Sequence, residues 1–120
     1  MALRGLTGDL PGNLSRQAAE DLIGILRRSA RDFGTAVARR SRDRLLVRIT
    51  AIQSGTAIGH RRHDVQTHRP THFLREDPWV ICFNPDTRQV YRILHGARDF
   101  PAIFGGPDGD SIPKASNDTT

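Results

Sequence analysis

The sequence has little of several residue types, and each shortage excludes a class of protein. Its single cysteine, Cys82, lies in an apolar run and rules out an internal disulfide, which fits a reducing compartment. No apolar run approaches the ~18 residues that a membrane-spanning helix needs. The segment Met1–Leu14 carries no stretch that looks like a signal peptide. We therefore expect a soluble, cytoplasmic protein.

Aromatic and hydrophobic residues are also scarce. Aromatic residues make up 6% of the chain and hydrophobic residues 37%. A length of 120 residues suits one domain. We therefore expect a thin core built from a few aliphatic clusters, and a fold that gains stability from a bound partner.

Lysine is almost absent, although the chain is basic. The chain has 18 cationic residues, of which only Lys114 is a lysine; its net charge is +5 and its pI about 10.9. Two causes remain open for the arginine bias: a GC-rich coding sequence, or a need for planar groups that bind carboxylates and phosphates. In both cases the positive charge favours an acidic protein or a nucleic acid as partner.

The first half of the sequence predicts two helices. Apolar residues recur at helical spacing over Leu14–Ser29, where Ser15 is the expected N-cap, and again over Thr35–Gln53. The stretch Arg-Asp-Phe-Gly at 31–34 interrupts the pattern, and Gly55 is expected to end the second helix. Two helices with a short join predict an antiparallel hairpin.

The second half predicts strands. Three runs have strand character: Thr71–Arg75, Trp79–Phe83 and Arg88–His95. Turn-forming residues separate them at 77–78 and 84–87. The expected fold class is α+β, with an N-terminal helical hairpin packed on a small antiparallel sheet. Both faces of the last two strands are partly apolar, so alternation does not tell which face the helices cover.

The two ends of the chain carry little pattern. The glycine-rich residues 1–13 allow at most one short edge strand, at 2–6, and without it one edge of the sheet would be open to a partner's strand. Residues 105–120 are expected to form a disordered tail. We therefore expect a single domain over residues 1–104.

A polar loop between the helices and the strands is dense in charge. His60, His63 and His68 match no common metal-site spacing, and no cysteine lies nearby. We expect a solvated loop, with Arg61 and Arg62 as contacts for a phosphate or carboxylate as the next choice. No motif for a cofactor stands out, so neither a metal nor a cofactor is predicted.

The most informative segment is 91–101. Its strand carries Arg92 and ends in His95-Gly96, and Ala-Arg-Asp-Phe-Pro follows at 97–101. This segment resembles the C-terminal signature of the ParE-type toxins in the RelE/ParE superfamily. The order of helices and strands is similar to that family over Leu14–Phe104.

The residues of this signature divide into two groups. Gly96, Asp99 and Pro101 are expected to fix the turn after the last strand. Arg92 and His95 lie among apolar neighbours, where a charge needs a partner or an open cleft, so a functional role stays open for them. The predicted contacts for an anionic partner are Arg61, Arg62, Arg75, Arg92, His95 and Arg98.

The resemblance implies one of two activities. RelE-like members are ribosome-dependent mRNA endoribonucleases, whereas ParE-like members poison DNA gyrase; in both, an acidic, partly disordered antitoxin neutralises the toxin. A nuclease would use His95 as acid or base, Arg75 and Arg92 on the phosphate, and Glu76 as a weak base candidate.

The chain's one tyrosine, Tyr91, would face away from Arg92 in a regular strand. Lysine is absent from residues 1–104. We favour the ParE-like, non-enzymatic interpretation; the nuclease, and a domain without toxicity, remain alternatives.

Overall fold

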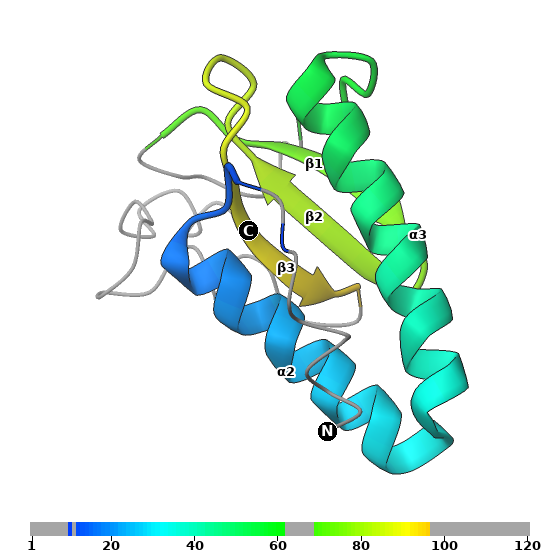
Figure 1. The fold of residues 1–120 in the computed structure, drawn as a ribbon. Helices are drawn as coiled ribbons and strands as arrows, with labels where there is room; N and C mark the ends of the chain where they lie inside the picture. The colour runs from blue at the N-terminus through cyan, green and yellow to red at the C-terminus, as the bar shows by residue number, and fades with distance from the viewer. Residues whose placement is uncertain (1–9, 11, 62–68, 97–120) are drawn as a thin grey trace, which may run out of the picture.

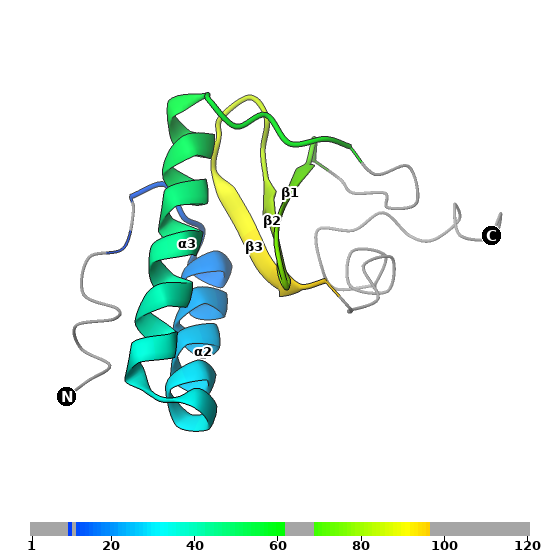
Figure 2. The same ribbon diagram turned by 90° about the vertical axis from the view of Figure 1, so that its right-hand side faces the viewer.

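The computed structural model describes residues 10, 12–61 and 69–96. Within these ranges the strands form one antiparallel sheet in the order β1-β2-β3. Both helices lie on the same face of this sheet (Figures 1 and 2). The predicted α+β fold, a helical hairpin packed on a small antiparallel sheet, is confirmed. In chain order the elements are α2 (Arg16–Phe33), α3 (Thr35–Ser54), β1 (His72–Glu76), β2 (Trp79–Phe83) and β3 (Val90–His95).

Helix α2 begins where the sequence predicted and ends later. The Ser15 hydroxyl accepts a hydrogen bond from the main-chain N–H of Ala18 at 3.0 Å, as expected of an N-cap. The helix does not end at Ser29 but continues through Phe33. The predicted break at 31–34 was inferred from a lost apolar pattern, and residues 31–33 are exposed, so helical backbone there needs no apolar face.

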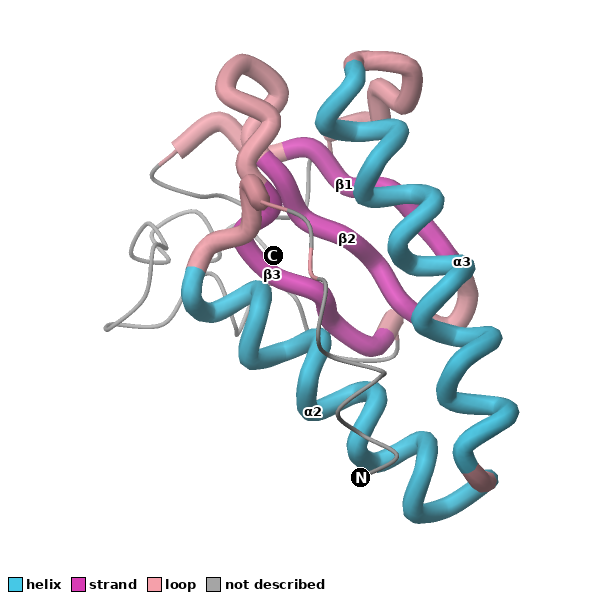
Figure 3. Tube along the Cα trace, in the orientation of Figure 1, coloured by secondary structure: helices cyan, strands magenta, loops and turns pink. Residues whose placement is uncertain are grey.

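One residue joins the two helices. Gly34 has φ of 95°, which a residue with a side chain rarely adopts, and its N–H donates to the carbonyl of Ala30. Helix α3 then runs to Ser54 and ends, as predicted, at Gly55, whose left-handed backbone directs its N–H back to the last turn. The hairpin is therefore tight, and its closed end extends past the sheet (Figures 1 and 3).

The main core lies between the helices and the sheet. Alternate residues of β2, namely Trp79, Ile81 and Phe83, face the helices, which answers the question that alternation left open. The fully buried helix residues in this core are Ala18, Leu22, Leu26, Ala38, Leu45, Ile49 and Ile52. A smaller buried cluster lies on the other face of the sheet and contains Phe73, Val80, Cys82 and Leu94, so Cys82 is a core residue.

The outer edge of β3 is covered at one end by the stretch around Leu14. Leu14 forms a parallel bridge with Val90: the Val90 N–H donates to Asn13 at 3.0 Å, and the Ser15 N–H donates to Val90 at 2.9 Å. The Ser15 hydroxyl also donates to the carbonyl of Tyr91. The stretch around Leu14 therefore takes the place of an edge strand at this end of β3. The predicted strand at 2–6 and the predicted tail at 105–120 lie outside the described residues.

Strand β3 starts later than predicted and is irregular. Arg88 has a positive φ of 64°, so it belongs to the turn and the strand begins at Val90. The register with β2 shifts between Cys82, which pairs with Arg92, and Phe83, which pairs with Val90. Tyr91 is thus an extra residue in a bulge, and the regular alternation assumed for Tyr91 and Arg92 does not hold.

Candidate partner-binding groove

A groove of about 710 Å³ lies where the helical hairpin extends past the sheet. Its walls are the inner faces of α2 and α3, and its floor is the end of the sheet formed by Trp79 and His95, which pair across β2 and β3. Apolar side chains from both helices line it, namely Ile25, Phe33 and Val37. Because a concave surface that combines apolar side chains with convergent polar groups is the usual form of a binding site, this groove is the candidate functional site.

Charged side chains lie around the apolar ones. Arg28, Arg44, Arg92 and His95 supply basic groups, while Glu20 and Asp21 supply acidic groups on the α2 wall. The described residues contain no cluster of three or more histidine, cysteine, aspartate or glutamate side chains that would hold a metal ion. The groove can therefore accept a segment that is apolar on one side and acidic at its margins.

Asp21 connects α2 to the outer edge of β3. Its carboxylate accepts hydrogen bonds from the Arg92 guanidinium at 2.8 and 3.3 Å, and from the main-chain N–H of Ile93 at 2.9 Å. The side chains of Asp21 and Arg92 are only 15% and 24% exposed. The contact explains how an arginine is accommodated on an apolar strand: its charge is paired, and the same carboxylate satisfies an edge N–H.

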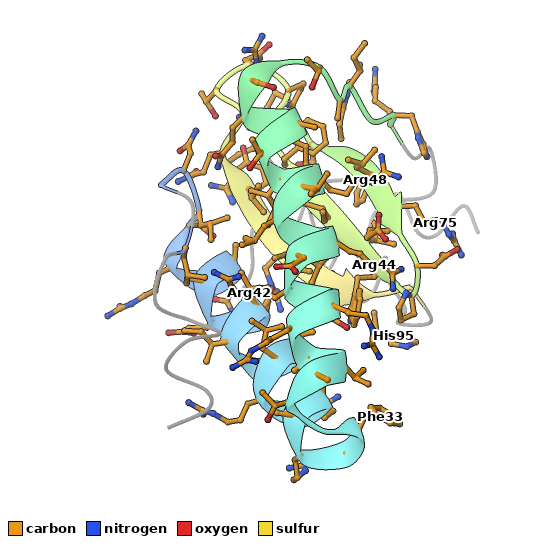
Figure 4. The ribbon with its side chains drawn as sticks, turned by 45° about the vertical axis from the view of Figure 1, so that its right-hand side comes forward. Phe33, Arg42, Arg44, Arg48, Arg75 and His95 are labelled. Carbon is orange, nitrogen blue, oxygen red and sulfur yellow. The ribbon has the colours of Figure 1, made fainter. Side chains whose placement is uncertain are left out.

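Glu76 connects the opposite edge of the sheet to α3. Its carboxylate accepts from Arg48 at 2.7 Å and from Arg44 at 2.8 Å, and Arg44 also donates to the carbonyl of Asp77. The hydrogen bond from Arg48 lowers the pKa of Glu76 below its ordinary value, with Arg44 adding to the effect and desolvation opposing it. Figure 4 shows Arg44 and Arg48 on the side of α3 that faces β1.

The other predicted contacts on the sheet lie apart from one another. Arg75 is on β1, outside the groove, and its Nε donates to Asp77 at 2.6 Å. His95 lines the groove at the end of β3, and the following Gly96 donates its N–H to Pro78 at 2.7 Å. A Cβ at Gly96 would lie 3.2 Å from that carbonyl oxygen, so the turn has little room for a side chain.

The candidate nuclease residues are thus only partly assembled. Arg92 and His95 share the groove, whereas Arg75 and Glu76 lie outside it. Tyr91 is buried, its hydroxyl accepts from Asn84 at 2.6 Å, and the Arg69 guanidinium stacks 3.8 Å from its ring. Arg61 is exposed beside the bridge between His60 and Phe73. Arg62, Arg98, Asp99 and Pro101 lie outside the described residues.

Several groove residues were not singled out from the sequence. Arg28, Arg44 and Val37 appeared only as parts of helical patterns, and Trp79 only as a strand residue. Phe33 fell in the stretch interpreted as a helix break. The one signal that could have found it was an aromatic residue at a helix end with no apolar partner at helical spacing. The remaining groove positions depend on how far the hairpin extends past the sheet, which sequence periodicity does not encode.

Comparison with known families assigns the chain. The model of the ParE toxin of the type II toxin–antitoxin system, parDE, matches residues 13–100. Neither the curated proteins nor the solved structures contain a match. No helix in the described part of the chain is both long and apolar enough to cross a membrane. The match covers the hairpin and the whole described sheet, so the chain belongs to the ParE toxin family of type II toxin–antitoxin systems.

Proposed function

We propose that this chain acts in the cytoplasm as a toxin that binds a host protein, DNA gyrase, and that an antitoxin segment lying in the groove neutralises it. The observation that carries the proposal is the groove itself, in which apolar side chains from both helices lie among four basic and two acidic side chains. An amphipathic, acidic segment complements that surface in shape and charge. Neither a metal nor a cofactor is part of this proposal.

Binding is favoured over RNA cleavage because of how the candidate residues are paired. Cleavage by attack of a 2′-hydroxyl needs an acid, a base and a cation that meet at one phosphate. Both Arg92 contacts described above go to Asp21, and Arg75 lies outside the groove beside Asp77. These arginines serve the fold or a protein partner better than a shared phosphate.

A supercoiling assay with purified gyrase tests the target. The toxin is expected to inhibit the enzyme in the assay, and a cognate antitoxin is expected to restore activity. Absence of inhibition at excess toxin would overturn gyrase as the target. Cuts in translated mRNA, mapped by primer extension and lost in His95→Ala, would instead support the nuclease.

A pair of valines on α3 tests the groove. Val37 lines the groove, whereas Val47 lies on the same helix with 67% of its surface exposed. Val37→Asp is expected to weaken antitoxin binding by at least about tenfold, since a carboxylate would replace an apolar side chain on the α3 wall of the groove. Val47→Asp is the control and should bind as the wild type does. Equal affinities for the two variants, measured by calorimetry, would place the antitoxin elsewhere.

A further inference from the structure

The closed end of the helical hairpin carries an exposed aromatic residue. We call residues 27–40 the hairpin tip; it extends past the end of the sheet (Figures 1 and 2). Phe33 lies there at the end of α2 with 70% of its surface exposed, and it projects from the hairpin on the side where His95 lies (Figure 4). Among the described residues, Val47 and Ile58 are the other large hydrophobic side chains exposed to this extent.

The hairpin tip is also strongly basic. Its arginines are all exposed. Asp32 is the one acidic residue in residues 27–40, and it accepts from Arg31 at 3.1 Å. The tip therefore carries an excess of positive charge around an exposed phenylalanine. The arginines are Arg27, Arg28, Arg31, Arg39 and Arg40.

We propose that the hairpin tip is the surface through which the toxin docks on its target, and that the target offers an acidic protein surface with an apolar recess for Phe33. The inference rests on the proposed function, since it assumes a toxin that acts by binding. Aromatic residues and arginines are enriched at protein interfaces, and charge complementarity requires acidic groups opposite this tip.

The apolar surface distinguishes a protein partner from a nucleic acid. Phe33 is continuous with the groove, which it lines together with Val37 and Ile25. A phosphate backbone would use the arginines and leave this apolar surface without a partner. A second copy of the chain does not fit either, because two tips with the same excess charge repel each other.

The geometry also explains how neutralisation would work. An antitoxin segment that fills the groove contacts Phe33, because Phe33 belongs to the groove lining. Antitoxin and target then compete for one side chain, and no conformational change is needed to silence the toxin.

Growth arrest after induced expression tests the tip independently of which target is bound. Phe33→Ala and Arg39→Glu are each expected to raise the inducer level needed for arrest by at least about tenfold. The matched controls are Val47→Ala, an exposed apolar residue, and Arg16→Glu, an exposed arginine at the other end of the hairpin. Both controls should arrest growth as the wild type does. Thermal melting of each purified variant checks that the fold is kept.

Each other outcome has a defined meaning. If the tip variants arrest growth at the wild-type inducer level, the hairpin tip is not the docking surface, and the proposed function itself is unaffected. A wild type that does not arrest growth would overturn the proposed function, and this inference with it. Binding to a plain DNA duplex is measured by fluorescence anisotropy over a salt series. If Arg39→Glu abolishes this binding and Phe33→Ala leaves it intact, the tip is a nucleic-acid surface and the proposed protein partner is wrong.

A fluorophore at position 33 tests the competition directly. Cys82 is the only cysteine in the sequence and is fully buried, so Phe33→Cys can be labelled selectively. Addition of the antitoxin is expected to shift the emission of the label, and a label at Val47→Cys should not respond. If neither label responds while calorimetry shows antitoxin binding, the antitoxin does not cover Phe33, and the shared-residue mechanism is wrong.

Discussion

One carboxylate joins each edge of the sheet to a helix. We call these contacts the β3 joint, made by Asp21, and the β1 joint, made by Glu76, and they differ in the groups that the carboxylate binds. Asp21 of α2 binds both a guanidinium and a main-chain N–H of β3, so it fixes the backbone of the strand. Glu76 of β1 binds only guanidinium groups of α3, Arg44 and Arg48. Both carboxylates are mostly buried, with side chains 15% and 12% exposed. The comparison indicates that the β3 joint fixes a strand backbone as well as a side chain, whereas the β1 joint holds only two half-exposed arginine side chains.

The largest effect is expected for Asp21→Asn. The substitution removes the negative charge opposite Arg92 and leaves the Ile93 N–H with a poorer acceptor. We expect the free energy of unfolding to fall by about 2–3 kcal/mol, measured by urea denaturation. The control is Asp43→Asn, whose carboxylate is 69% exposed beside Arg42; it should change stability by less than about 0.5 kcal/mol.

A double variant separates the two roles of Asp21. Adding Arg92→Met removes the unpaired charge but leaves the Ile93 N–H with the poorer amide acceptor, so less than about half of the lost stability should return. Full recovery would show that Asp21 serves only the ion pair. In that case the β3 joint would be no different in kind from the β1 joint.

A smaller, pH-dependent effect is expected for Glu76→Gln. The substitution should cost about 1 kcal/mol at neutral pH, since both arginines are about half exposed. The folded-state pKa of Glu76 is lowered, so its contribution is complete above the ordinary value of 4.5 and is lost as the pH falls through the lower folded pKa. Urea denaturation of both proteins between about pH 6 and pH 3 should show the two stabilities converging. A gap that stays constant with pH would contradict the role given to Glu76.

Salt should weaken the two joints unequally. Screening at about 0.5 M sodium chloride acts mainly on exposed charges. The stability loss in Glu76→Gln is therefore expected to shrink by roughly half, and that in Asp21→Asn by much less, since a hydrogen bond to a main-chain N–H does not depend on a second charge. Equal salt sensitivity in parallel urea titrations would remove the distinction between the edges.

The fold was largely predictable from the sequence, because local patterns determine it. Helical spacing, the Ser15 cap and the turn at Asn84 were sufficient to define two helices and the last two strands. The joints were not predictable. Asp21 and Ile93 meet only when α2 lies along β3, and Glu76 lies between two arginines one turn apart on α3 only in the folded chain. The helix end at Phe33 was missed because a solvent-exposed end needs no apolar pattern.

The smallest effect is expected for Arg75→Ala, and that smallness makes it useful. Arg75 and Asp77 form an ion pair with both side chains about 70% exposed, so neither carries a desolvation cost that the pair must offset. We expect stability to change by less than about 0.5 kcal/mol in urea. A weaker antitoxin affinity of this variant, measured by calorimetry, would then report a lost contact rather than a damaged fold. A stability loss above about 1 kcal/mol would instead show that exposure does not separate structural from partner-facing arginines on this sheet.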